Sequence, residues 1–266
     1  KMVGKIISIF DISIEVVLSS NEVKVGDILE LEGNSKYRFE VVEISNTSAT
    51  CISLDSTRGL KKGANVVIAS HGINVEYSDK ILGRIFNSYG IPIDKEPMNS
   101  VQTRRVDHPT TTLQELNIES KILWTGIKVI DFFAPLQKGF KMGLLGGAGV
   151  GKNVLIKEII HNVYTSLNSN AIFTGIGERS REGQELYSEM KESNLLDKMA
   201  MVYGQMGDNP VSRSKAVYSG LTMAEYLRDE KKQDVLLFID NIYRFVQAKS
   251  EIATELKQIL IGNGYP

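Results

Sequence analysis

The chain has 266 residues, with 31 basic and 32 acidic side chains and a single cysteine. The length suggests one large or two smaller domains, and the net charge of -1 argues against a protein whose main partner is nucleic acid, because phosphate backbones attract surplus Lys and Arg. With only Cys51, this sequence has no intramolecular disulfide and no cysteine zinc cluster, which indicates a reducing compartment. The longest aliphatic or aromatic run, residues 235–239, is too short to span a bilayer. We therefore expect a soluble intracellular protein, or the soluble part of a larger machine.

The first 76 residues have the pattern of short β-strands. Apolar and polar residues alternate over residues 12–18 and 37–41, and Gly and Asn turns separate such runs. Five or six short strands without a helix favour a small closed barrel, because closure leaves no unpaired strand edge. We predict an N-terminal β-barrel domain over residues 1–76.

A different rhythm follows a linker and entry segment, which we assign to residues 77–122 because its second half is rich in Pro, Asn, Ser and Thr. Beyond it, strands and helices alternate, which is typical of a parallel sheet covered on both faces. The predicted strands are residues 143–145, 171–176, 199–203 and 235–239, and the predicted helices are residues 153–163, 180–192 and 212–228. We assign residues 123–266 to this α/β domain.

Residues 146–153 read GGAGVGKN, which matches the phosphate-binding pattern G-x-x-x-x-G-K and then has Asn153 where Ser or Thr is expected. Glycines let backbone N–H groups surround a phosphate, the following helix adds its positive dipole end, and Lys152 supplies a charge for the β and γ phosphates. The alternative is a glycine-rich turn that binds nothing. The candidate nucleotide-binding residues are Gly146, Gly147, Ala148, Gly149, Val150, Gly151, Lys152, Asn153 and Val154.

Charged residues also follow two predicted strands. Asp240 ends the apolar strand 235–239, at the sheet edge where α/β proteins bind ligands, and would hold Mg²⁺ through a water; alternatively, it caps the next helix. Glu178 and Arg179 come shortly after Ile176. A carboxylate there can orient an attacking water, and a guanidinium can neutralise charge on a transferring phosphoryl group. By composition alone, an ordinary charged first turn of a helix is the simpler interpretation.

Eight segments, in order along the chain, together match one known family. They are LDSTRGL (54–60), LGRIFNSYGIPID (82–94), TGIKVIDFFAPLQKG (125–139), GLLGGAGVGKNVLIKEIIHNV (143–163), GIGERSREGQELYSEM (175–190), MVYGQM (201–206), GLTMAEYLRD (220–229) and DVLLFIDNIYRF (234–245). With these segments the chain resembles the catalytic β subunit of rotary F-type ATP synthases over nearly its whole length. It is also similar to F-type-like ATPase paralogues of the mycoplasma kind.

The resemblance implies a β-barrel followed by an α/β RecA-like P-loop domain that binds ATP or ADP with Mg²⁺. It also implies a helical C-terminal domain, which this sequence does not contain, and an adenine pocket that lies beyond residue 266. The expected partners are α-type subunits, which alternate with β-type subunits in a hexamer and supply an arginine finger, and a central γ-type stalk. A membrane sector or other membrane machinery would be an indirect partner, which places the complex at the cytoplasmic face of the cell membrane.

Roles for individual residues also follow from the resemblance. Lys152 corresponds to the phosphate-loop lysine and Glu178 to the glutamate that positions the attacking water. Arg179 and Arg244 correspond to arginines that hold the γ-phosphate or the product phosphate. The residues implied around Mg²⁺ are Asn153, Glu182 and Asp240.

The sequence departs from the family pattern in three places. Asn153 replaces a Thr whose hydroxyl ligates Mg²⁺, so we expect weakened metal coordination, although an amide oxygen is also a ligand. Residues 207–212 and 257–263 differ in loops that face neighbouring subunits and the shaft in the family, so these loops affect the choice of partners.

The sequence is compatible with several functions. The first is a β-type subunit that hydrolyses or synthesises ATP and couples this to rotation. The alternatives are a nucleotide-binding structural subunit in which Asn153 impairs magnesium binding, and an F-type-like motor that drives a process other than proton transport. An RNA translocase of the Rho type also joins a barrel to a RecA-like domain, but few barrel aromatics and the near-zero net charge oppose it.

Overall fold

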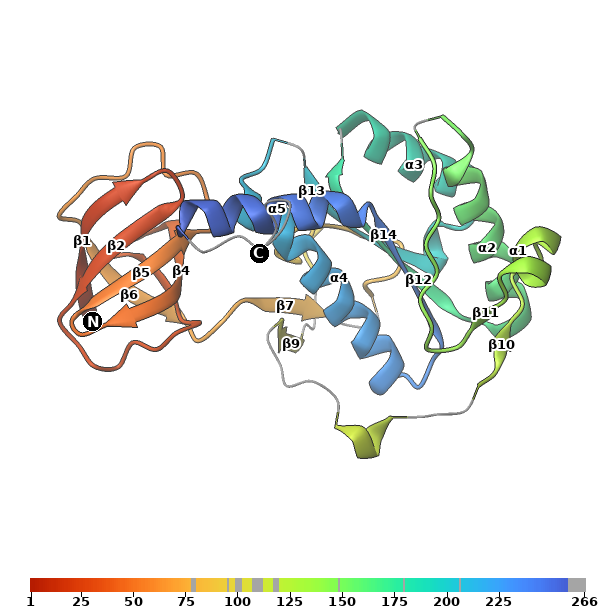
Figure 1. The fold of residues 1–266 in the computed structure, drawn as a ribbon, viewed down its shortest axis with the longest axis horizontal. Coiled ribbons are helices and arrows are strands. Elements are labelled where there is room, and N and C mark those ends of the chain that lie inside the picture. Colours follow the sequence, from red (N-terminus) through yellow and green to blue (C-terminus); the bar gives the residue numbers. More distant parts are fainter. Residues whose placement is uncertain are drawn as a thin grey trace.

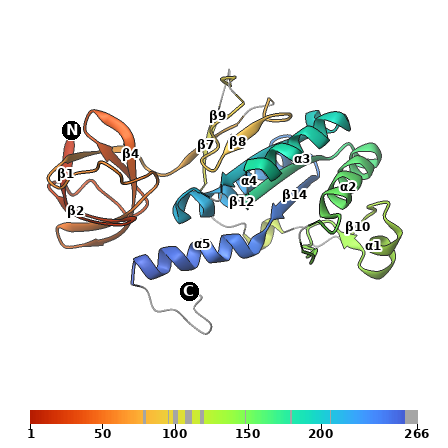
Figure 2. The same ribbon diagram turned by 90° about the horizontal axis from the view of Figure 1, so that it is seen from above.

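A computed structural model describes residues 1–77, 80–94, 96–98, 102–106, 112–116, 120–147, 149–178, 180–205 and 207–257. The chain forms a barrel and a larger α/β domain, which lie side by side along the longest axis of the molecule (Figures 1 and 2). In the part of the chain that the structure describes, every helix is too short or too polar to span a membrane.

Six antiparallel strands close the predicted N-terminal barrel in the order β1-β2-β5-β4-β3-β6. The alternation of the sequence places every second side chain inside, so Ile14, Val16, Phe39, Val41 and Cys51 are buried in one cluster. The prediction of a barrel is confirmed. Its strands are β1 (Met2–Phe10), β2 (Ser13–Leu18), β3 (Ile28–Leu31), β4 (Asn34–Ser45), β5 (Ser48–Ser53) and β6 (Asn65–Ser70).

The second domain contains a four-stranded parallel sheet in the order β14-β12-β13-β8. This confirms the predicted α/β domain with a parallel sheet. The strands are β8 (Ile85–Asn87), β12 (Asn170–Glu178), β13 (Met199–Gln205) and β14 (Val235–Asp240). The helices are α1 (Lys128–Phe133), α2 (Lys152–Leu167), α3 (Ser180–Glu192), α4 (Pro210–Asp229) and α5 (Ile242–Glu255). Short ladders pair β7 (Asn74–Tyr77) with β9 (Gln102–Arg105) and β10 (Ile122–Leu123) with β11 (Leu136–Gln137), and 3₁₀ turns cover Leu113–Glu115 and Leu196–Lys198.

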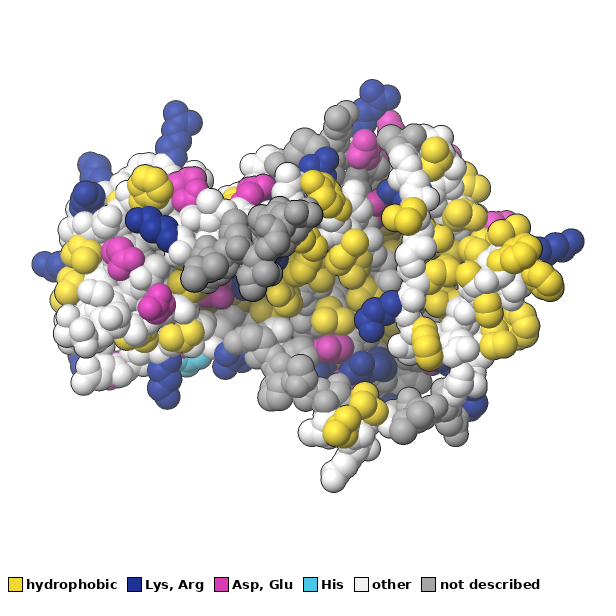
Figure 3. Space-filling view, viewed as in Figure 1, with side chains coloured by type: hydrophobic (Ala, Val, Ile, Leu, Met, Phe, Trp, Pro, Cys, Tyr) yellow, Lys and Arg dark blue, Asp and Glu magenta, His cyan; other side chains and the backbone are white. Residues whose placement is uncertain are grey.

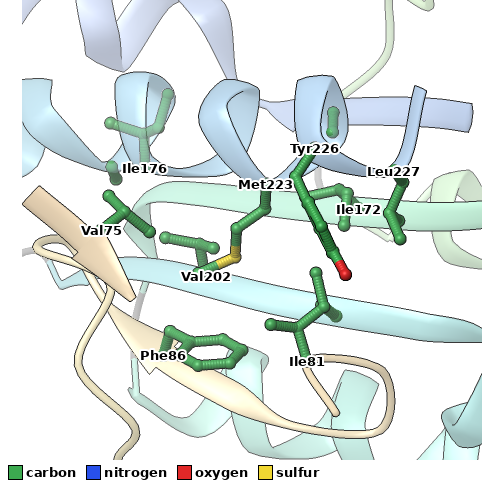
Figure 4. Close-up of a cluster of buried hydrophobic side chains, with 12 residues drawn as sticks. Val75, Ile81, Phe86, Ile172, Ile176, Val202, Met223, Tyr226 and Leu227 are labelled. Atoms are coloured by element: carbon green, nitrogen blue, oxygen red, sulfur yellow. The ribbon is translucent and has the colours of Figure 1, made fainter. Parts of the chain in front are cut away.

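Successive residues of β12 and β13 point to opposite faces of this sheet, and each face is covered by helices. On one face, Ile172 and Val202 pack with Met223 and Tyr226 of α4 (Figure 4). On the other face, Phe173 belongs to a cluster with residues of α2 and α3. Because both faces are covered, both strands are apolar almost throughout. This arrangement holds the start of α2 and the carboxyl ends of the strands within one domain.

The α/β domain differs from the sequence prediction in several elements. The helices α1 and α5 and the strands β9, β10 and β11 were not predicted, and two further differences concern the strands of the sheet. Residues 143–145, predicted as a strand, form none, and the Leu145 side chain is fully exposed. Apolar composition favours a strand, but a strand also needs a neighbour to pair with, and in the described chain no segment pairs with this one. Conversely, β8 lies inside the predicted linker and entry segment, where it forms the sheet edge beside β13.

Side chains of α4 connect the two domains. Asn209 accepts a hydrogen bond from the Ser212 backbone N–H, which caps α4, and donates through Nδ2 to the carbonyl oxygens of Ser53 and Asp55. Lys215 forms an ion pair with Glu40 of the barrel at 2.8 Å. The start of α4 is thereby fixed to the barrel.

The end of the domain that carries α1 has an apolar surface. Hydrophobic side chains gather over it (Figure 3), and Val129, Phe132 and Phe133 are each at least two-thirds exposed. Apolar surface of this extent is normally covered by another segment or another chain.

We expect Gly220→Ala to destabilise the protein by about 1–3 kcal/mol, because α4 lies too close to β12 to admit a methyl group. A Cβ at Gly220 would overlap Thr174 Oγ1, which is buried. Urea denaturation measures the loss. Thr174→Ala in the same chain removes the clashing oxygen and should restore much of the stability; a double variant no more stable than Gly220→Ala would contradict the contact.

Cys51 should be inert in the folded protein. Burial, with a smaller contribution from the charge of Glu15, raises the pKa of its thiol to about 12, and the reactive species is the thiolate. A disulfide reagent at pH 8 is therefore expected to modify the native protein far more slowly than protein unfolded in guanidinium. Equal rates in the two states would show that the barrel opens readily around this residue.

Candidate functional site

The phosphate loop enters α2 through two glycines in the left-handed region. Gly149 has φ 74° and Gly151 has φ 90°, conformations that favour glycine. A Cβ built at either position would meet no atom within 4 Å, so the loop borders open space. Gly146, Gly147 and Val150 are exposed with it, whereas Ala148 lies outside the described residues.

The first turn of α2 is open to an anion. Gly151 is the N-cap and has no side chain to cap the helix, and the first backbone N–H to bond back to it is that of Leu155. The preceding N–H groups, of Lys152, Asn153 and Val154, therefore stay free within the helix, at its positive dipole end. A phosphate is the kind of group that binds there.

Lys152 and Asp240 lie together, although 88 residues separate them in sequence. Lys152 Nζ donates to Asp240 Oδ1 at 2.6 Å, and the two side chains are 32% and 12% exposed. Lys152 begins α2 and Asp240 ends β14, so both charges come from the ends of regular elements. The sequence predicted both residues at the site but not their direct contact.

The carboxyl end of β12 lies beside that of β14, with Gly175 opposite Asp240 in the register. Glu178 is the last residue of β12; only its backbone is described, and Arg179 lies outside the described residues. Glu178 thus follows three residues beyond the position that faces Asp240.

Arg244 approaches the same strand end from α5. A Cβ at Gly177, which has φ 64°, would lie 3.4 Å from Arg244 Cγ and Cδ, so the arginine stem packs directly over this glycine. Its guanidinium donates to Gln247 Oε1 at 3.1 Å, and it forms no ion pair with the residues that the structure describes. Asn241 caps α5 by accepting from the Arg244 backbone N–H, so the cap that Asp240 was alternatively expected to provide comes from its neighbour. The sequence analysis did not identify Gly177 as a site residue. The available signal was its position directly before Glu178, at the end of the strand.

The oxygen donors at this site suit Mg²⁺, which takes one or two carboxylates and completes its coordination with phosphate oxygens and waters. Asp240 offers its second carboxylate oxygen, and half-buried Asn153 has no side-chain hydrogen bond within the described ranges. Glu182 lies exposed in the first turn of α3, without a described bond to either residue. Asp240 and Asn153 are therefore the residues that could hold a metal ion, whereas Glu182 has no described contact with either of them.

A separate cavity of about 600 Å³ lies between the barrel and the α/β domain. Some of its polar groups are bonded to protein: Arg38 pairs with Asp55 at 3.0 Å, Tyr89 donates to the Leu54 carbonyl oxygen, and Asp208 accepts from the Gln205 backbone N–H. None of the predicted site residues lines it. Because residues of both domains line it, this cavity is part of the junction between the domains.

Residues 126–266 match the family model described as "ATP synthase alpha/beta family, nucleotide-binding domain". The match covers more than half of the chain and includes the phosphate loop and the ends of β12 and β14. It therefore agrees with the open N-terminus of α2 and with the cationic side chains of Lys152 and Arg244 at this site. The chain belongs to the ATP synthase alpha/beta family, and residues 126–266 match the model of its nucleotide-binding domain.

Proposed function

We propose that this chain is a catalytic β-type subunit of a rotary F-type or F-type-like ATPase, which binds Mg-ATP and hydrolyses or synthesises it to turn a central shaft. The observation that supports the catalytic role is the place of Glu178, at the carboxyl end of β12 beside the strand that carries Asp240. An acid at that place can polarise a water for attack on the terminal phosphate.

The other groups of the site would bind and orient the phosphates. Free N–H groups at the start of α2 and the ammonium of Lys152 would hold the β and γ phosphates. Arg244, without a carboxylate partner in the described chain, would neutralise charge on the terminal phosphate, as would Arg179. Asp240 and Asn153 would hold Mg²⁺, which when bound would neutralise phosphate charge.

The family assembles as a hetero-oligomeric ring, which bears on partners. We infer that α-type subunits alternate with this chain and supply an arginine finger in trans, as partner proteins do in other phosphoryl-transfer enzymes. A γ-type stalk would occupy the centre, and a membrane sector or other membrane machinery would be engaged indirectly. The complex would then lie at the cytoplasmic face of the cell membrane.

A second candidate is a nucleotide-binding subunit of the same ring that does not turn over ATP, and the observation that favours it is Asn153 in place of a hydroxyl ligand. A third is a rotary motor that drives a process other than proton transport. The sequence of residues 207–212 and 257–263 favours this third candidate, because it departs from the family pattern in segments that the resemblance places toward partners.

In the assembled complex, Glu178→Gln should lower ATP turnover by about 10²- to 10⁴-fold while leaving nucleotide binding in place, because the amide cannot accept a proton from water. A steady-state assay of phosphate release measures this. Glu185→Gln, which removes an exposed carboxylate of α3 paired with Arg181, is the matched control and should leave turnover unchanged. Full activity of the Glu178→Gln complex would show that this chain is not the catalytic subunit.

Asn153→Thr should lower the Mg²⁺ concentration for half-maximal ATP turnover by about tenfold. Substitutions around a metal site typically change metal affinity by about 10- to 100-fold, and we expect the lower end of that range. A hydroxyl is smaller than an amide and brings fewer donors that compete for phosphate. Titration of turnover with Mg²⁺ measures the shift. An unchanged Mg²⁺ requirement would show that the amide is an adequate ligand, and would remove the support for a non-catalytic subunit.

A further inference from the structure

The contact between Lys152 and Asp240 joins two groups that have different tasks once a nucleotide is bound. Lys152 Nζ lies 2.6 Å from Asp240 Oδ1, with the carboxylate almost buried. Under the proposed function, the ammonium belongs on phosphate and the carboxylate belongs on the metal. In this structure each group therefore blocks the other: Asp240 takes the ammonium that would bind phosphate, and Lys152 takes a carboxylate oxygen that would bind the metal.

The Lys152–Asp240 ion pair and a metal ion bound at Asp240 exclude one another. A divalent cation at Asp240 would lie within a few ångströms of the Lys152 ammonium, and like charges at that separation repel strongly in a partly buried site. Conversely, when Lys152 leaves Asp240, the ammonium needs a phosphate as its new partner. Breaking a partly buried ion pair otherwise leaves charges without a counter-charge, which is unfavourable. Nucleotide and metal together satisfy both groups; either alone leaves one of them unpaired.

We propose that Asp240 holds Lys152 away from the phosphate position in the nucleotide-free subunit and releases it when the carboxylate turns to a metal ion. The phosphate loop would then bind metal-free nucleotide weakly and Mg²⁺-nucleotide strongly. This inference rests on the proposed function, since it assigns Lys152 and Asp240 to phosphate and metal. It adds that their direct contact makes the two binding events depend on one another.

The same helix provides a matched control. Lys157, also on α2, pairs with Glu189 of α3 at 3.1 Å, with side chains 27% and 40% exposed. This pair lies farther along the helix, away from the phosphate loop. Glu189→Gln removes a carboxylate from a lysine of α2 without touching the proposed site.

The first measurement is the rate at which an amine-acylating reagent labels each lysine in the assembled complex, read by peptide mass spectrometry. Without metal, Asp240→Asn should speed the labelling of Lys152 about 5- to 10-fold, and Mg²⁺ alone should speed it in the wild type but not in the variant. Glu189→Gln should speed only Lys157. Labelling of Lys152 that ignores both Mg²⁺ and Asp240→Asn would overturn the proposal.

The second measurement is ADP binding by calorimetry, in EDTA and in Mg²⁺. Asp240→Asn should tighten metal-free binding about 5- to 10-fold and reduce the gain from Mg²⁺, whereas Glu189→Gln should change neither. Removing a negative charge would also help phosphate binding without any contact to Lys152. The Lys152→Gln background separates the two causes: a gain that disappears there acts through the lysine, and a gain that persists overturns the proposal.

These outcomes distinguish failure of this inference from failure of the proposed function. A wild-type complex that binds no ADP even with Mg²⁺ would contradict the assignment of the site. A wild type that binds ADP with Mg²⁺, beside an Asp240→Asn variant with no gain in EDTA, would contradict only the role of Asp240 in holding Lys152.

Discussion

The position of β12 is the constraint on which the rest of the α/β domain depends. β12 lies between β13 and β14, and its alternate residues face α4 on one side of the sheet and α2 and α3 on the other. A strand buried on both faces has little freedom to shift its register, because a slip of one residue would exchange its two apolar faces. Its carboxyl end therefore brings Gly177 and Glu178 to a fixed place just beyond the position that faces Asp240.

The site combines opposite charges in a chain whose net charge is close to zero. Lys152 and Asp240 neutralise one another directly, whereas Arg244 lies over Gly177 without a carboxylate among its described partners. The surroundings of each charge, rather than the total, decide what can bind: an open helix N-terminus and an unpaired guanidinium attract phosphate, and a carboxylate attracts a cation. Affinity for a charged ligand then depends on how these charges exchange partners.

Much of the architecture could be predicted from local pattern. Alternation over residues 12–18 and 37–41 was enough to predict the barrel, because period-two burial is a property of each strand by itself. β8 was missed because three residues carry too little periodicity to be recognised, and residues 143–145 were wrongly predicted as a strand. Pairing with a distant neighbour, which decides both cases, leaves no local signal in the sequence.

For the site, the sequence by itself determined which residues carry charge and that they follow strands or begin a helix: the phosphate loop with Lys152, and Glu178 and Asp240 at strand ends. Only the tertiary structure decided which of these residues contact one another. Lys152 meets Asp240 across 88 positions of sequence, and Arg244 reaches Gly177 from another helix. Such contacts depend on how the sheet orders its strands and how helices pack on it, and many distant apolar residues fix that order together.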